Sequence, residues 1–289
     1  MEAVICGYAQ ISDPQLLTLI NDFIKLIQDA QSQDGYLYTY NQLIFPESRW
    51  QNLQIEHELY CHGHLIEAAV SYFQVTGESK FLTVAIKAAD FLVNTFSDKG
   101  SLHTPGHQEI EIALLRLYEI NGTQSYLDLA YQFLHQRGNH KPLAFSLHML
   151  GENQRLNQHT AYYKHKQNQY ELDHSETSVD SKLPPPNKIQ SLQSAKLRFS
   201  ISALNGKYFQ QHQPLSAQTQ PVGHAVRFAY LQTAATKYSH LRPNNSWLST
   251  LQKSWDHMVT RRMAVTGGIG SLPYSEGFGR DYELDPKMM

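Results

Sequence analysis

The sequence has few charged residues and no excess of either sign. Its 289 residues include 24 Lys and Arg against 26 Asp and Glu, and charged side chains make up only 17% of the chain. This near balance excludes the basic surface of a nucleic-acid-binding protein and the composition of an acidic disordered tail. A chain of this length is still long enough to bury a sizeable core in one large domain or two small ones.

Long apolar runs and cysteines are also scarce. No run approaches the roughly 20 residues that a membrane-spanning helix needs, and no basic segment precedes an apolar one at the N-terminus, as in a signal peptide. The two cysteines, Cys6 and Cys61, are too few for a disulfide framework. We therefore expect a cytoplasmic protein with neither a membrane nor a nucleic acid as its partner. Histidine and ring side chains are abundant instead, with 15 His, 17 Tyr and 12 Phe.

A helical hairpin recurs along the chain. Each copy opens at a Gly-His pair, at 63–64, 106–107 and 223–224, and continues with apolar residues at helical spacing. The first two copies turn at Gly77 and Gly122 and continue into a second apolar helix. These repeats predict an all-α fold of about seven to nine helices without a central sheet.

The spacing of the copies indicates how they assemble. The first two follow closely and the third comes much later, whereas an open solenoid needs a steady period. Unequal loops at one rim favour a closed α/α toroid, with residues 1–289 as a single domain. A further helix is expected from Asp13-Pro14, which are a good N-cap and first residue, to about Gln31. Residues 36–50 read as a loop or a short extended segment.

The segment 154–207 interrupts the repeat. It is rich in Gln, Asn, His and Ser, which is typical of an insertion or a long loop in the domain. We expect a partial helix at 162–169. Residues 173–187 should be the least ordered and the first to be cut by a protease, because three consecutive prolines exclude a regular helix.

The densest polar cluster is His57-Glu58-Leu59-Tyr60-Cys61-His62-Gly63-His64. On a helix, His57, Cys61 and His64 share one face, and their types are those of zinc ligands. Three ligands on consecutive turns of one helix are nevertheless hard to arrange around a tetrahedral ion. We favour a buried cysteine with hydrogen-bonded imidazoles over a metal site.

For the other candidate residues, spacing alone does not separate a functional role from a structural one. His107 and His224 occupy equivalent places at the start of their repeats, where an imidazole can hydrogen-bond a hydroxyl-rich ligand or simply pack. Three glutamates lie on or near one helix, but helical glutamates are usually solvated, so we expect no role for them. Glu276 lies in a Gly-rich loop beside Phe278, where a carboxyl can serve as a general acid or can simply be exposed. The three helical glutamates are Glu109, Glu111 and Glu119.

Five sequence segments together resemble a known protein family. They run through most of the chain, with the main gap at about 165–207. They are DGYLYTY, RWQNLQIEHELYCHGHLIEAAVSYFQVTGESKFL, PGHQEIEIALLRLYEINGTQSYLDLAYQFLHQRG, QPVGHAVRFAYL and VTGGIGSLPYSEGFGRDYEL. Together they resemble glycoside hydrolase family 127, the β-L-arabinofuranosidase family. The resemblance implies an (α/α)6 toroid of antiparallel helical hairpins as the catalytic domain.

The resemblance also implies chemistry. Members of this family are retaining exo-enzymes that act on non-reducing terminal L-arabinofuranose, with a zinc-bound cysteine thiolate as nucleophile and a glutamate as acid/base. By motif, the acid/base residue is Glu276. The histidines of His-Glu-Leu-Tyr, Pro-Gly-His-x-Glu and Val-Gly-His-Ala-Val bind the sugar in the family, and here they are His57, His107 and His224.

This sequence departs from the family at the zinc site. The family carries Glu-x-Cys after the Asp-Tyr-x-Leu-Pro string and a Cys-Cys pair further on, but neither occurs here, and Cys6 and Cys61 match neither. We therefore expect no zinc on this chain and no activity from it alone. The sequence also reads as a partial toroid from a truncated catalytic domain, and exposed toroid surface should favour self-association.

Two other functions remain open. One is a degenerate, non-catalytic remnant that binds sugar weakly. The other is a helical-repeat scaffold for a protein partner, in which His57, His107, His224 and Glu276 do not converge. A different α/α-toroid sugar enzyme, such as an epimerase, fits the quoted strings less well.

Overall fold

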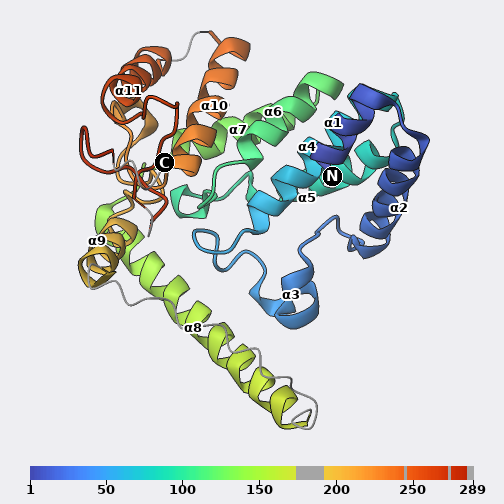
Figure 1. Ribbon diagram of the computed structural model, residues 1–289, viewed down its shortest axis with the longest axis horizontal. Helices are drawn as coiled ribbons and strands as arrows, with labels where there is room; N and C mark the ends of the chain where they lie inside the picture. Colours follow the sequence, from blue (N-terminus) through green and yellow to red (C-terminus); the bar gives the residue numbers. More distant parts are fainter. Residues whose placement is uncertain (174–191, 244–245, 273–274, 285–289) are drawn as a thin grey trace.

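The computed structural model describes residues 1–173, 192–243, 246–272 and 275–284 (Figure 1). Across these ranges all named elements are helices, and β-pairing is limited to isolated bridges, so the all-α prediction is confirmed. They contain eleven α-helices, more than the seven to nine expected. The bounds are α1 Glu2–Ile11, α2 Pro14–Ala30, α3 Thr39–Ile44, α4 Glu58–Thr76, α5 Lys80–Phe96, α6 Ile110–Asn121, α7 Gln124–Gln136, α8 Pro142–Asp173, α9 Leu192–Leu204, α10 Ala225–Leu241 and α11 Leu248–Arg261.

Eight of these helices form four hairpins: α1–α2, α4–α5, α6–α7 and α10–α11. The first helices of the hairpins, α1, α4, α6 and α10, contact one another in that order (Figure 1). The three hairpins read from the repeat are present, and α1–α2 adds a fourth. The turn between α1 and α2 consists of Ser12, which has a left-handed conformation, and Asp13, whose side chain accepts a hydrogen bond from the amide of Gln15 as the N-cap of α2.

The Gly-His pairs do not open the helices in every copy, contrary to expectation. Helix α4 begins at Glu58, so Gly63 lies inside it. A Cβ on Gly63 would come within 2.6 Å of Cγ of Glu109, so the missing side chain lets α4 approach the start of α6. Tertiary packing therefore explains this glycine, although glycine weakens a helix interior.

Part of the segment expected to be a loop, 36–50, forms the short helix α3 and the 3₁₀ helix Pro46–Ser48. The reason is a distant partner. The ring of Phe45 stacks on that of His159 of α8, with centroids 3.7 Å apart, and Ser48 Oγ lies 3.2 Å from His159 Nε2. Local sequence spacing contains no sign of this contact.

Helix α8 leaves the row of hairpins and packs against α9 (Figure 1). The helix expected at 162–169 is part of α8, which is much longer than predicted. The region 174–187, expected to have the least order, lies outside the described residues. Among the residues that are described, no helix is both long and apolar enough to cross a membrane.

Candidate functional site

Three histidines from three hairpins meet at the starts of their helices. His57 and His224 are the N-cap residues of α4 and α10, and His107 lies in the loop just before α6. The ring centroids of His57 and His107 are 5.7 Å apart, and those of His107 and His224 are also 5.7 Å apart. The structure therefore brings these sequence candidates into one cluster, which argues against the scaffold alternative.

Glu276 joins this cluster through His224. Its carboxylate Oε2 lies 3.1 Å from Nε2 of His224. Two backbone hydrogen bonds hold the Gly-rich loop there: the amide of Ala225 donates to the carbonyl of Glu276 at 2.9 Å, and that of Phe278 donates to the carbonyl of Gly223 at 2.9 Å. Phe278 packs into the core, whereas the side chain of Glu276 is 74% exposed.

The hydrogen bonds of His224 define its tautomer. Its Nδ1 accepts from the backbone amides of Val226 and Arg227, as a helix cap does. An accepting Nδ1 carries no proton, so the ring proton is on Nε2 and points at the carboxylate of Glu276. In this arrangement a neutral imidazole donates its Nε2 proton toward the carboxyl group of Glu276.

Burial makes the imidazoles hard to protonate. Burial, and after it the charge of the nearby Arg227 guanidinium, lowers the pKa of His107 to about 3 and that of His224 to about 4. The pKa of His57 is lowered by the same two causes in the same order. All three rings are therefore neutral at pH 7, and a neutral imidazole offers one donor and one acceptor to a hydroxyl-rich ligand.

Two tyrosines that the sequence analysis missed flank His107. The ring centroid of Tyr60 is 4.4 Å from that of His107, and the centroid of Tyr230 is 5.6 Å from it. Tyr60 lies three residues after His57, almost one helical turn, and spacing along α4 was the one available signal for it. Such rings offer an apolar face and a hydroxyl to a sugar.

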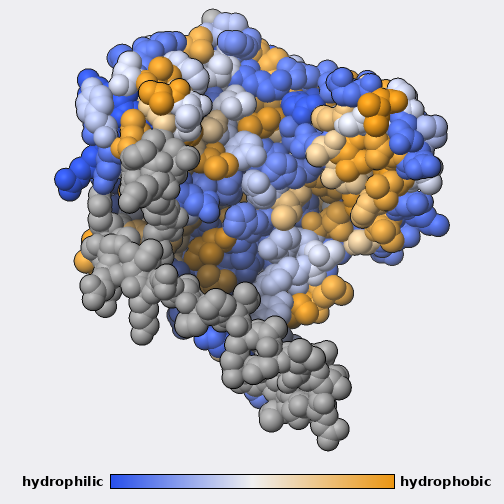
Figure 2. Space-filling model, in the orientation of Figure 1, coloured by the Kyte–Doolittle hydropathy of each residue, from blue (hydrophilic) through white to orange (hydrophobic). Residues whose placement is uncertain are grey.

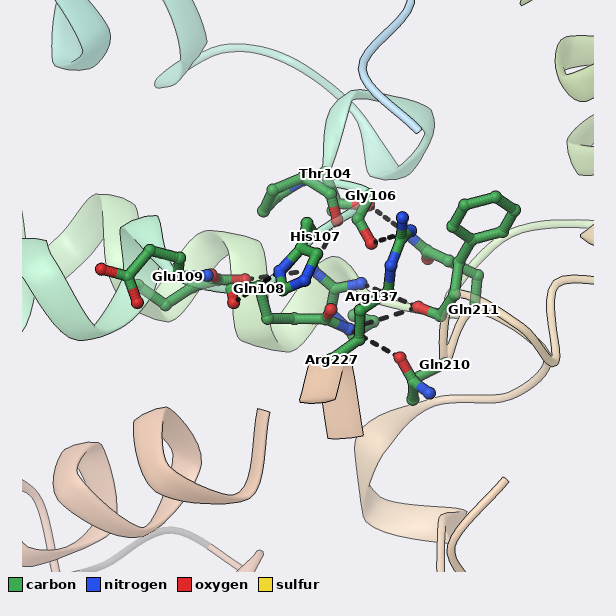
Figure 3. Close-up of polar contacts among 12 residues, drawn as sticks. Thr104, Gly106, His107, Gln108, Glu109, Arg137, Gln210, Gln211 and Arg227 are labelled. Atoms are coloured by element: carbon green, nitrogen blue, oxygen red, sulfur yellow. Dashed lines mark hydrogen bonds and ion pairs between the residues drawn. The ribbon is translucent and has the colours of Figure 1, made fainter. Parts of the chain in front are cut away.

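The loops that carry the histidines rest on buried polar side chains. Glu152 of α8 accepts hydrogen bonds from the amides of Gln54 and Ile55, just before His57. Gln108, next to His107, donates to the carbonyl of Phe209 and to Oε1 of Gln210 (Figure 3). These contacts join segments far apart in sequence, and no local pattern predicts them.

Two of the helical glutamates are not solvated, contrary to expectation. Glu109 is 2% exposed and Glu111 is fully buried, because α4 and α7 cover the start of α6. Glu111 pairs with the equally buried Arg137 at 3.1 Å. For Glu119, in contrast, the expectation was right: it is exposed and pairs with Lys237.

Glu109 has the most unusual carboxyl in this region. Its Oε1 is buried without a hydrogen-bond partner, and His64 Nδ1 lies 3.6 Å away (Figure 3 shows Glu109 pointing away from Arg137). Burial, then the charges of Glu67 and Glu111, raises its pKa to about 9. Glu109 is therefore a neutral acid at pH 7.

The metal site considered for His57, Cys61 and His64 does not form. Within the described ranges, no three His, Cys, Asp or Glu side chains come together closely enough to hold a metal ion. Cys6 and Cys61 are both free and exposed, so the expectation of a buried Cys61 is wrong. The donors present therefore do not fit a zinc site with several thiolate ligands.

The buried ionisable groups predict how stability depends on pH. Seven imidazoles have a pKa lowered by burial, four of them to about 3 or about 4, so the unfolded chain binds their protons first, and the free energy of unfolding falls as pH drops from about 6.5 to about 4. The carboxyls of Glu58 and Glu109 have a pKa raised to about 7 and about 9, so their contribution is lost as pH rises toward those values. The four imidazoles are those of His62, His107, His212 and His224.

The seven imidazoles with a lowered pKa outnumber the four carboxyls with a raised pKa, those of Glu58, Glu67, Glu109 and Glu111. We therefore expect the highest Tm near pH 6.5, with a decline on both sides. Thermal unfolding followed by circular dichroism across this pH range measures it. A Tm that climbs steadily above pH 6.5 would contradict the protonated state assigned to Glu109.

Comparisons with known proteins agree with this architecture. The family model described as the GH127 catalytic domain of β-L-arabinofuranosidase matches residues 1–289. A non-reducing end β-L-arabinofuranosidase of Bifidobacterium longum subsp. longum is 32% identical over 290 aligned positions, which cover 98% of this chain and 38% of that protein.

Solved structures of GH127 enzymes superpose on nearly the whole of this chain. A GH127 β-L-arabinofuranosidase from Geobacillus stearothermophilus T6 superposes with a TM-score of 0.75 at 35% identity, over 98% of this chain and 38% of that one. A second GH127 β-arabinofuranosidase gives 0.70 at 28% identity, over 98% and 36%. The chain thus spans less than two fifths of the length of these relatives.

Proposed function

The chain belongs to the GH127 family of β-L-arabinofuranosidase catalytic domains, and from this premise we propose that its histidine cluster binds a non-reducing terminal L-arabinofuranose. The ligand is the end of an oligosaccharide or glycoside. His57, His107 and His224 hydrogen-bond its hydroxyls, and Glu276 is the acid/base residue, which in its protonated form gives a proton to the leaving-group oxygen when a nucleophile attacks the sugar carbon. A cytoplasmic location and the lack of a zinc ion on this chain belong to the same proposal.

The convergence of the three imidazoles carries this proposal. A neutral ring with a fixed tautomer discriminates among hydroxyls, because each nitrogen either donates or accepts. Both nitrogens of His224 already have partners, so a hydroxyl that binds this ring takes the place of the exposed Glu276 carboxylate at Nε2. Glu276 lies at the edge of the cluster and is open to solvent, where a leaving group departs. A retaining hydrolase also needs a nucleophile, and none of the four residues supplies one.

Binding can be tested without catalysis. We expect methyl β-L-arabinofuranoside to shift the side-chain NMR signals of His107 and His224, and His107→Ala to weaken binding about tenfold by removing a ligand hydrogen bond. His135→Ala, on the exposed outer face of α7, is the matched control and should bind like the wild type. Shifts as large with the D-arabinofuranoside, or none with either sugar, would contradict the proposal.

We further propose that the four hairpins form an arc of a six-hairpin toroid. The outermost hairpins have uncovered faces: α2 exposes Leu19, Phe23 and Leu26, and a pocket of about 700 Å³ opens between α1, α2, α3 and α4. Figure 2 shows hydrophobic residues gathered over this edge. At the opposite edge, α11 exposes Trp255 and Val259.

Such faces favour self-association of the chain. We expect a sedimentation coefficient that rises with protein concentration, and a double variant, Phe23→Ser with Leu26→Ser, that shifts the equilibrium toward the monomer. Val265→Ser removes an exposed apolar side chain outside these edges and should change nothing. A wild type that stays monomeric at high concentration would contradict this expectation.

A further inference from the structure

Arg227 lies in the first turn of α10, and its side chain is buried beneath the histidine cluster (Figure 3). Its Nη1 donates to the carbonyl of Gly106 at 2.8 Å and, more weakly, to that of Gln54 at 3.4 Å. The rings of Tyr208 and Phe209 cover the guanidinium, with centroids 5.0 Å and 4.7 Å from its central carbon. Two backbone carbonyls and two aromatic rings therefore fix the position of the guanidinium.

Each of its two hydrogen bonds reaches a segment that carries a site histidine. Gly106 immediately precedes His107, Gln54 lies three residues before His57, and Arg227 itself follows His224 by three. The two loops touch directly, because a Cβ on Gly106 would overlap the backbone of Gln54. One side chain thus joins the three segments at the point where two of them meet.

The positive charge of Arg227 has no obvious value for stability. In the described part of the chain, no carboxylate lies within ion-pair distance of it, and its Nε is buried without a partner. The neighbouring Arg137, in contrast, pairs with Glu111. Apolar side chains often replace buried charges without loss of stability, so an unpaired buried guanidinium at this place suggests another purpose.

We propose that Arg227 is a positioning residue that sets the relative places of the His57, His107 and His224 rings and fixes a positive charge beneath the loops that carry them. The fixed geometry comes from its hydrogen bonds to Gly106 and Gln54. The electrostatic part comes from its charge, which disfavours a second positive charge nearby. The consequence for sugar binding rests on the proposed function, whereas the effect on the histidines does not.

Other groups also act on these rings. Besides Arg227, His107 faces His57 and His224, and Tyr60 and Tyr230 pack on it. For His224 the additional neighbours are Glu276, which favours the charged ring, and Tyr208. Burial alone keeps part of the pKa depression, so loss of Arg227 should reverse it only in part.

The test compares Arg227→Met with Arg227→Lys by NMR of the histidine side-chain nitrogens between pH 3 and pH 7. In the wild type, His107 and His224 should remain neutral above about pH 5, because their pKa values are lowered to about 3 and about 4. In Arg227→Met we expect their protonation midpoints to rise by about one pH unit, because the charge is gone. In Arg227→Lys the midpoints should stay low, but the single ammonium bridges the two carbonyls poorly.

For Arg227→Lys we therefore expect weaker ring-to-ring NOEs between His57 and His107 and about tenfold weaker binding of methyl β-L-arabinofuranoside. The control is the charge-neutral double variant Arg137→Met with Glu111→Gln, which removes the neighbouring buried pair. It should lower Tm and leave the histidine midpoints unchanged.

If the protonation midpoints of His107 and His224 in folded Arg227→Met equal those of the wild type, the electrostatic part of the proposal is wrong. If the NOEs between His57 and His107 in Arg227→Lys are as strong as in the wild type, the positioning part is wrong. If Arg227→Met does not fold, Arg227→Gln, which keeps hydrogen-bond donors without the charge, replaces it for the midpoints, and the NOEs of Arg227→Lys decide the positioning part. A wild type that binds no sugar would contradict the proposed function and leave the histidine results to decide the role of Arg227.

Discussion

The purified 289-residue chain is expected to hydrolyse an aryl β-L-arabinofuranoside no faster than background and to bind no stoichiometric zinc. A retaining hydrolase needs a nucleophile as well as an acid/base, and Glu276 supplies only the second. The family's nucleophile is a zinc-bound thiolate, whereas Cys6 and Cys61 lie outside the family's cysteine motifs. Loss of a covalent nucleophile lowers the rate by several orders of magnitude.

The measurement is release of the aryl group, together with metal analysis of the dialysed protein. Glu276→Gln is the companion variant, and it should be as inactive as the wild type while still folded. Zinc-dependent turnover that disappears in Glu276→Gln would contradict the prediction, because another residue would then replace the missing cysteine. Sugar binding without turnover would match the non-catalytic remnant.

Glu111→Gln is expected to destabilise the fold by about 3–5 kcal/mol, because it leaves the buried guanidinium of Arg137 without its counter-charge. Both side chains are fully buried, and the ion pair is 3.1 Å long. The remaining partners of Arg137 are the carbonyls of Pro105 and Phe209, which cannot balance a positive charge. Burial raises the pKa of Glu111 and lowers that of Arg137, as expected for a pair taken out of water.

Urea unfolding of the two proteins measures this loss. Glu119→Gln on the same helix is the matched control: its partner Lys237 is near the surface, so the cost should stay below about 1 kcal/mol. An equal loss in both variants would mean that burial of the Glu111–Arg137 pair adds nothing.

The roles predicted for the three histidines and Glu276 came from the sequence segments that resemble the family, and not from the spacing of the residues. Spacing alone left His107 and His224 open between ligand binding and packing, and it did not separate His57 from His64. The strings selected His57, and the structure places its ring beside that of His107. The roles of these residues and of Glu276 remain predictions, because geometry shows proximity and not chemistry.

The sequence by itself determined three of the four hairpins and the start of α2, because apolar spacing, the Asp13 cap and the turn glycines at 77 and 122 act within a few residues of themselves. Only the tertiary structure decided which polar groups are buried. Glu111 and Arg137 lie on different helices, and Arg227 reaches carbonyls far back along the chain. A charge is stable inside a protein only when distant segments supply its partners, and that information is absent from local sequence.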